Sequence, residues 1–187
     1  EAIHHHYDVS NAFYERVLGP SMTYTCAAYN DEKNTLEEAQ ENKYRLIFDK
    51  LRLKPGDRLL DIGCGWGGMV RYGASRGVKT LGVTLSAEQA EWAQKKIVDE
   101  GLSELAEVRF SDYRDVTESD FDAVSSIGLT EHIGVHNYPA YFSFIRDKLR
   151  VGGMMLNHCI TRPDNFKNAR AGSFIDRYVF PDGELTG

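Results

Sequence analysis

Apolar residues recur along the chain with two alternating periods. Short apolar runs of strand length lie at 58–63, 79–83, 106–111, 121–127 and 154–160. Between them, residues 67–77, 86–100 and 138–149 repeat their apolar positions at helical spacing. Strands that alternate with helices of this length are typical of right-handed βαβ units. The pattern therefore predicts an α/β fold with a doubly wound, mainly parallel sheet.

The first part of the chain carries helical signals and is rich in aromatic residues. A short helix is predicted over 11–18, and Thr35 with Glu38 forms a capping box for a longer helix. That helix repeats its inward positions at helical spacing: Leu36, Ala39, Lys43, Leu46, Ile47 and Leu51. We expect this helical segment, 1–57, to lie over the active site of a core spanning 58–187.

Residues typical of turns and helix caps mark the boundaries between the predicted elements. Lys54–Asp57 precedes the first strand, and Val151-Gly152-Gly153 is predicted as a turn before the fifth. Ser86 and Gln89 form a second capping box. Residues 163–187 contain one helical stretch and a turn at 180–183, with no further strand. An apolar edge strand is avoided in natural sheets, so we expect the C-terminal strands of a longer enzyme to be missing.

The amino-acid composition limits the classes of protein to which the chain can belong. The chain has 187 residues, is 42% apolar and 27% charged, and carries a net charge of −6. This is the profile of one globular domain, and its acidity argues against nucleic acid as a partner. No apolar run approaches the roughly 20 residues that span a bilayer. The three cysteines, Cys26, Cys64 and Cys159, form no CxxC pair, so we expect neither disulfides nor a metal site. This cysteine usage also leads us to expect a cytoplasmic location.

A glycine-rich loop, Asp61-Ile62-Gly63-Cys64-Gly65-Trp66-Gly67-Gly68, joins the first strand to the next helix. Glycines let a backbone approach a ligand closely, although a tight turn without ligand is the alternative. A dinucleotide site requires G-x-G-x-x-G and an acid about 20 positions on. The second strand ends in Gly82-Val83-Thr84-Leu85-Ser86, a segment that contains no acidic residue. The loop resembles instead the first motif of Rossmann-like class I S-adenosylmethionine-dependent methyltransferases.

Residues for such a cofactor can be named from this resemblance and from their place in the sequence. Thr84 and Gln89 are the candidates for the ribose, with Gln89 equally explained as a capping residue. Asp112 and Tyr113, after the third strand, are the candidates for the adenine. Five further residues complete the set: Tyr24, Asp61, Gly63, Gly65 and Leu85.

Several segments also resemble one specific family, the cyclopropane-fatty-acid and cyclopropane mycolic acid synthases. The matches follow the family's order along nearly the whole chain: 6–11 (HYDVSN), 22–27 (MTYTCA), 36–40 (LEEAQ), 60–67 (LDIGCGWG), 82–86 (GVTLS), 126–132 (SIGLTEH) and 156–161 (LNHCIT). The triplet Ser111-Asp112-Tyr113 departs from the Gly-Trp-Glu of the mycolic branch. It places the chain closer to the phospholipid-acyl branch.

The resemblance implies methyl transfer from S-adenosylmethionine to a cis double bond of a phospholipid acyl chain. The resulting carbocation loses a proton to a bound bicarbonate ion, and a cyclopropane ring closes. The positions that match the bicarbonate site are Cys26, Glu131, His158 and Ile160. The family's last bicarbonate contact, a tyrosine, has no assigned counterpart here.

Other interpretations of these residues stay open at this point. Glu131 could be an ordinary loop carboxylate, His158 a satisfied strand histidine and Cys26 a buried apolar residue. Tyr14, Tyr24 and Tyr29 could line the acyl site or belong to the core. His4-His5-His6 is interpreted as native and not metal-binding, since adjacent histidines do not converge on one ion.

Alternative functions are a methylene- or methyl-branched product from the same first step, or an inactive cofactor-binding module. We expect transient peripheral contact with the inner face of a membrane, and leave homo-oligomerisation open.

Overall fold

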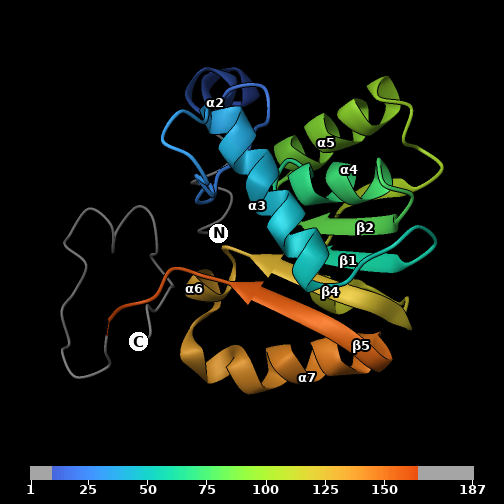
Figure 1. Ribbon diagram of the computed structural model, residues 1–187. Coiled ribbons are helices and arrows are strands. Elements are labelled where there is room, and N and C mark those ends of the chain that lie inside the picture. Colours follow the sequence, from blue (N-terminus) through green and yellow to red (C-terminus); the bar gives the residue numbers. More distant parts are fainter. Residues whose placement is uncertain (1–9, 164–187) are drawn as a thin grey trace.

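The computed structural model describes residues 10–163. The His4–His6 run and nearly all of the stretch predicted for 163–187 lie outside them. The described residues form one five-stranded sheet of order β3-β2-β1-β4-β5, and every neighbouring pair is parallel. The strands are β1 (Arg58–Ile62), β2 (Lys79–Thr84), β3 (Ala106–Phe110), β4 (Phe121–Ile127) and β5 (Leu149–His158). The predicted parallel, doubly wound sheet is confirmed (Figure 1).

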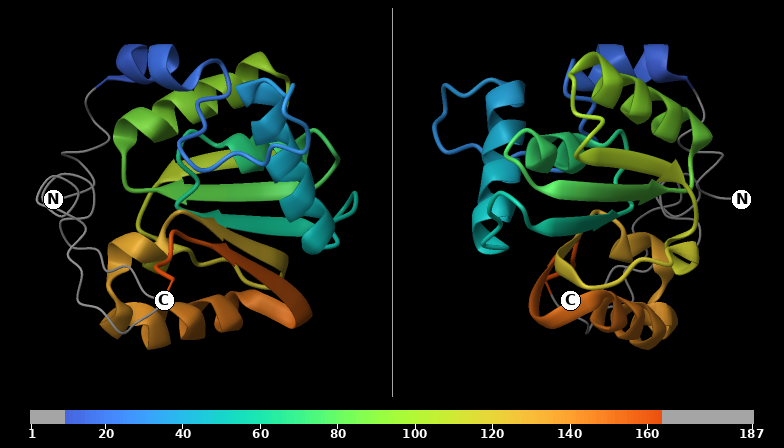
Figure 2. Two further views of the ribbon diagram at one scale, coloured as in Figure 1. Left: turned by 60° about the vertical axis from the view of Figure 1, so that its left-hand side comes forward. Right: turned by 90° about the vertical axis from the view of Figure 1, so that its right-hand side faces the viewer.

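Helices cover both faces of this sheet. They are α2 (Asn11–Leu18), α3 (Leu36–Lys50), α4 (Gly68–Ala74), α5 (Ala87–Asp99), α6 (Thr130–Ile133) and α7 (Tyr138–Lys148). One face is packed by α3, α4 and α5, whose apolar residues share core clusters with Leu59 and Val108. The opposite face is packed by α7, through Tyr141 and Ile145 against Leu60 and Val124. Figure 2 shows α5 and α7 on opposite sides of the strands.

The helix α3 begins at the predicted capping box. The Thr35 side chain accepts a hydrogen bond from the Glu38 amide, and the Glu38 carboxylate accepts one from the Thr35 amide. The buried face is not wholly apolar, because Gln40, Lys43 and Tyr44 lie on it beside Ala39 and Ile47. Two positions of the predicted apolar stripe, Leu36 and Leu46, are instead 37% and 49% exposed.

The predicted turn at Val151-Gly152-Gly153 is wrong. These residues lie inside β5, where the pairing partner of Phe121 is Leu149 but that of Ala123 is Met154. The extra residues of β5 form an irregularity in the ladder, the kind of local insertion that a β-bulge accommodates. Gly152 takes a positive φ of 76° there. The strand therefore begins five residues before the predicted Met154 and ends at His158, before Ile160.

The helix α2 is joined to the rest of the molecule through tryptophan side chains. The Trp66 indole N–H donates to Asn11 Oδ1 at 2.7 Å, and the Trp92 indole N–H donates to Glu15 Oε1 at 2.9 Å. The Asn11 amide in turn donates to the Glu88 carboxylate at 3.3 Å. Trp66 belongs to the glycine loop and Trp92 to α5. The helix α2 thus rests on both of these elements.

Candidate active site

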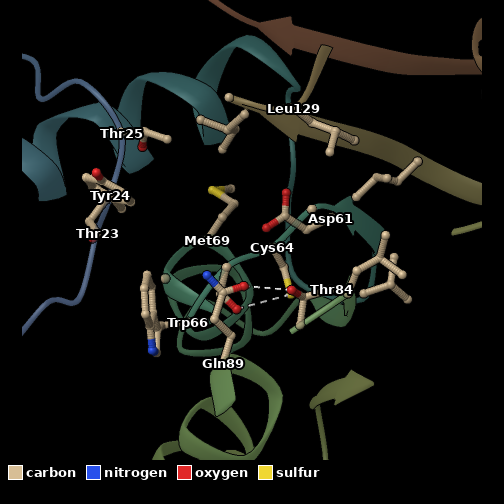
Figure 3. A pocket seen from close by; sticks show the side chains of 18 of the residues that line it. Thr23, Tyr24, Thr25, Asp61, Cys64, Trp66, Met69, Thr84, Gln89 and Leu129 are labelled. Atoms are coloured by element: carbon tan, nitrogen blue, oxygen red, sulfur yellow. Dashed lines mark hydrogen bonds between the residues drawn. The ribbon is translucent and has the colours of Figure 1, made fainter. Parts of the chain in front are cut away.

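A pocket opens at the carboxyl ends of β1, β2 and β4, where open α/β sheets hold their ligands. The glycine loop forms its floor, and residues 22–25 of the N-terminal segment form one wall. Residues 22–28 are called the wall segment below. Thr84 and Gln89 lie on another side, and the Asp61 carboxylate points into the space between (Figure 3).

The glycine loop is shaped by steric requirements that differ from residue to residue. A Cβ on Gly68 would lie 2.0 Å from the Tyr44 hydroxyl oxygen, so α4 can approach α3 only with glycine there. Gly65 has a φ of +56° and nothing within 4 Å of where its Cβ would project. Its backbone is therefore left bare toward the pocket, the arrangement that a closely bound ligand needs.

Asp61, at the end of β1, is a carboxylate in a buried position. It is 2% exposed and accepts a hydrogen bond from Ser125 Oγ at 2.6 Å. Burial raises the pKa of Asp61 to about 7, although the Ser125 hydrogen bond and the Lys43 charge counteract that rise. At neutral pH this carboxylate is the natural partner of a ligand ammonium group.

The raised pKa of Asp61 gives a prediction about stability. The folded state binds this proton more tightly than the unfolded state, so the Asp61 contribution to stability is largest below its unfolded pKa. It is lost as the pH rises from about 4 to the folded pKa of about 7. We therefore expect Asp61→Asn to gain stability relative to wild type over that interval, by on the order of 3 kcal/mol. Urea unfolding at pH 4.5 and 7.5 measures the difference, and a pH-independent difference would contradict it.

Thr84 and Gln89 face the pocket as a hydrogen-bonded pair. The Thr84 hydroxyl donates to Gln89 Oε1 at 2.7 Å, and both residues are buried. The Ser86 side chain caps α5 by accepting from the Gln89 amide. The Ser86 amide donates to the Thr84 hydroxyl at 3.3 Å and not to the Gln89 side chain, so the predicted second capping box is only half formed, and the Gln89 side chain faces the pocket instead. Leu85 lies beside them in the lining.

The two adenine candidates separate in the structure. Tyr113 lines the pocket, and its ring packs edge-on against Tyr141 with centroids 5.2 Å apart. Asp112 is not among the lining residues. It caps the short turn Tyr113–Asp115 and forms an ion pair with Arg114 at 2.6 Å, which holds the pKa of its carboxyl below the usual value. Ser111, which was not predicted, lines the pocket instead.

A second group of predicted residues gathers beside the pocket, where β4 and β5 end. It consists of Glu131, His158 and Ile160 and is called the Glu131 cluster. Glu131 is 3% exposed, and its Oε1 accepts a hydrogen bond from the Ile160 amide at 3.2 Å. Burial raises the pKa of Glu131, while the Ile160 hydrogen bond and His158 oppose the rise.

Two buried polar atoms of the Glu131 cluster lack a hydrogen-bond partner among the described residues. Within residues 10–163, Glu131 Oε2 and His158 Nδ1 are buried and have no hydrogen-bond partner. Such atoms are costly unless something pairs with them. The interpretation of His158 as a satisfied strand histidine is therefore not supported. A small oxyanion that has both a hydroxyl and acceptor oxygens fits these two atoms.

Gly128 joins the pocket to the Glu131 cluster. It lines the pocket, and its amide donates to the His158 carbonyl at 2.8 Å. A Cβ there would lie 2.8 Å from Thr25 Cγ2 and 3.8 Å from Glu131 Oε1. The wall segment and Glu131 thus approach Gly128 together. Cys26, the next residue of the wall segment, has an exposed side chain, so its interpretation as a buried apolar residue is wrong.

Some residues of the site carry no prediction from the sequence. Thr23, Tyr44, Leu129 and His132 line the pocket. Lys43 is hydrogen-bonded to Thr25 of the wall segment and is 5% exposed. The available signal was a lysine at an inward position of the α3 stripe, where an apolar residue is usual.

The comparisons with known proteins show the family of the chain. The family model for mycolic acid cyclopropane synthetase matches residues 1–187. A probable fatty acid methyltransferase of Mycobacterium tuberculosis is 74% identical over 187 residues, all of this chain and 44% of that protein. The cyclopropane-fatty-acyl-phospholipid synthase of Escherichia coli K12 is 43% identical over 96% of this chain and 45% of its own length. The chain thus spans about half the length of these relatives.

A solved structure agrees in fold. The mycolic acid cyclopropane synthase CmaA1, complexed with SAH and CTAB, superposes with a TM-score of 0.87 at 36% identity, over 100% of this chain and 69% of that one. No helix within residues 10–163 is long and apolar enough to cross a membrane. The chain belongs to the mycolic acid cyclopropane synthetase family and has the fold of the class I S-adenosylmethionine-dependent methyltransferases.

Proposed function

We propose that the pocket binds S-adenosylmethionine and that the protein methylates the cis double bond of an unsaturated phospholipid acyl chain, giving a cyclopropane. The observation that carries this proposal is the junction at Gly128. The pocket and a cluster with unpaired polar atoms adjoin there. Methyl transfer followed by proton removal needs the two sites to be neighbours.

The pocket residues suit the cofactor group by group. Asp61 would accept hydrogen bonds from the ammonium of the methionine end, and the bare backbone at Gly65 would lie against the same part. The Thr84 and Gln89 pair offers polar atoms to the ribose hydroxyls. Tyr113 offers a ring to the adenine. Tyr24 borders the same space, with its ring 5.6 Å from that of Tyr14.

The Glu131 cluster suits a bicarbonate ion. Glu131 Oε2 would accept the hydrogen bond of the ion's hydroxyl, and His158 would donate to one of its oxygens. Cys26 and Ile160 would contribute chiefly backbone groups. When bound, S-adenosylmethionine supplies an electrophilic methyl group and bicarbonate supplies a base.

The residues of the site then have to stabilise a positive charge. An alkene is a weak nucleophile, so its attack on the methyl group leaves a carbocation on the acyl chain. The tyrosine rings at the pocket wall would stabilise that charge through their faces. Loss of a proton from the new methyl carbon closes the ring. Glu131 and His158 would orient the base for this proton.

The substrate lies in a membrane, so we propose transient peripheral contact. Apolar side chains on the N-terminal part of the described chain support this: Phe13 and Val17 on α2, and Tyr24 and Tyr29 after it, are each more than 40% exposed. The division into a covering segment over 1–57 and a core from 58 stays a proposal, since α3 of the first part shares a core cluster with Leu59 of β1.

A second product class is favoured by one comparison. The relative with 74% identity is named a probable fatty acid methyltransferase, not a cyclopropane synthase. The same carbocation gives a methylene-branched chain when a hydride first shifts from the methyl-bearing carbon to the cationic carbon and a proton of the new methyl group then leaves. The position of the base relative to the acyl chain decides between the two products.

One experiment tests both products. The protein is incubated with vesicles of cis-monounsaturated phospholipid and methyl-labelled S-adenosylmethionine, and the acyl chains are analysed by mass spectrometry before and after catalytic hydrogenation. We expect a labelled product that resists hydrogenation, as a ring does under mild conditions. A labelled product that takes up hydrogen would establish the methylene-branched alternative. Label that reaches no lipid would refute both.

A further inference from the structure

Lys43 is a buried lysine whose role the pocket lining does not explain. It lies on the inward face of α3 and is 5% exposed. Burial lowers the pKa of its ammonium to about 8, while Cys26 and Asp61 raise it. A lysine is rarely buried without a partner, so its surroundings should show what it does.

The ammonium reaches two parts of the site at once. Its Nζ donates a short hydrogen bond to the Thr25 hydroxyl in the wall segment. Its charge also acts on Asp61, lowering the pKa of that carboxyl. Lys43 is therefore hydrogen-bonded to the wall segment that carries Cys26, and its charge is coupled to the carboxylate at the end of β1.

Neighbouring residues of α3 hold the same wall segment. The Gln40 side-chain amide donates to the Thr25 carbonyl at 2.8 Å. Thr23 and Tyr44 share a hydrogen bond of 2.7 Å between their hydroxyls, and the Ala28 amide donates to the Ala39 carbonyl at 3.0 Å. Among these attachments, only the one from Lys43 carries a charge.

Other titratable or charged groups lie near this pair: Cys26 interacts electrostatically with Lys43, Arg71 interacts with Tyr44, and His132 lines the pocket. Burial raises the pKa of Tyr44, whose ring centroid lies 5.1 Å from Lys43 Nζ, to about 12. Burial likewise raises the pKa values of Cys64 and Tyr141, both of which feel the Asp61 charge. Tyr44, Cys64 and Tyr141 therefore stay neutral between pH 6 and 8, the range in which Asp61 and Lys43 change their charge.

We propose that Lys43 is a positioning residue of the methyl-transfer site, which fixes the wall segment through Thr25 and places a positive charge beside the Asp61 carboxylate. The inference rests on the proposed function, because Asp61 is taken to receive the ammonium of the cofactor's methionine end. Lys43 itself does not touch the reacting atoms. It acts by favouring the ionised form of Asp61 and by holding the wall segment that carries Cys26.

The test measures S-adenosylhomocysteine affinity by calorimetry from pH 6 to 8.5. Wild-type affinity should fall at low pH, as Asp61 takes up its proton. In Lys43→Met the neighbouring positive charge is gone, so this fall should begin at a pH higher by about 1 unit. Affinity at pH 7 should drop by up to about tenfold. Lys43→Arg keeps the charge and should keep the wild-type profile.

Three further variants separate the charge from a structural role. Lys50→Met, at an exposed lysine of the same helix, is the matched control and should behave as wild type. Thr25→Val removes the hydrogen bond but not the charge, and should leave the pH of the fall unmoved while lowering turnover. Lys43→Gln replaces the methionine variant if that variant does not fold.

The outcomes distinguish this inference from the function beneath it. If the wild type does not bind S-adenosylhomocysteine, the proposed function fails first. If the wild type binds, and the neutral Lys43 variants lose the same affinity at every pH or none at all, then only the role of Lys43 is overturned. A pH profile moved by Lys43→Met and restored by Lys43→Arg would establish the role.

Discussion

Replacing Glu131 by glutamine is expected to lower the turnover of labelled lipid by about 10²- to 10⁴-fold, the range typical of a group that serves proton transfer. The amide is nearly isosteric with the carboxylate, so the Ile160 amide keeps an acceptor oxygen. The free Oε2 is replaced by a donor, which can no longer accept the hydroxyl of a bound oxyanion. S-adenosylmethionine affinity should stay within about twofold of wild type, because Glu131 does not line the pocket.

Single-turnover kinetics and calorimetry on the same preparation measure the two quantities. Glu91→Gln is the matched control, since Glu91 is an exposed glutamate on α5. Full activity in Glu131→Gln would remove the Glu131 cluster from the mechanism. A parallel loss of cofactor affinity would instead place Glu131 in cofactor binding.

Replacing Gly65 by alanine is expected to weaken S-adenosylmethionine binding about 10- to 100-fold, the equivalent of 1–3 kcal/mol of steric conflict. The added methyl group would project from the floor of the pocket, where Gly65 now has nothing within 4 Å. The backbone cost is separate. A φ of +56° disfavours any residue with a Cβ by about 1–2 kcal/mol.

Gly101→Ala isolates that backbone cost. Gly101 has a φ of +69°, likewise has nothing within 4 Å of its Cβ position, and lies after α5, outside the pocket lining. Both variants should lose a similar free energy of unfolding in urea, and only Gly65→Ala should lose cofactor affinity in calorimetry. Equal affinities in the two variants would show that the cofactor does not approach this loop.

Much of the fold could be predicted because local signals were sufficient. The bounds of α2 and β4 follow directly from hydrophobic spacing, and the cap of α3 from Thr35 and Glu38. The interior of β5 could not be predicted in this way. Val151-Gly152-Gly153 has the composition of a turn, and only its pairing with β4 makes it part of a strand.

The residues of the candidate site likewise differ in how far the sequence could predict them. Asp61, Thr84 and Glu131 were named from the resemblance to a family of methyltransferases, and the parallel sheet brings the strand ends that carry them to one edge. Asp112 was predicted for the adenine but lies outside the pocket lining, where its carboxylate pairs with the neighbouring Arg114. Lys43 received no role because the contact with Thr25 joins a helix to a distant loop, and sequence spacing carries no information about such a contact.

The attachment of α2 has a spectroscopic consequence. The chain contains two tryptophans, and the indole N–H of each is bonded to α2. One of them, Trp66, lines the pocket and packs against Tyr14 with ring centroids 4.8 Å apart. Indole emission depends on hydrogen bonding and on exposure to water. The intrinsic fluorescence of this protein is therefore a built-in reporter of the contact between α2 and the glycine loop, which needs no attached dye.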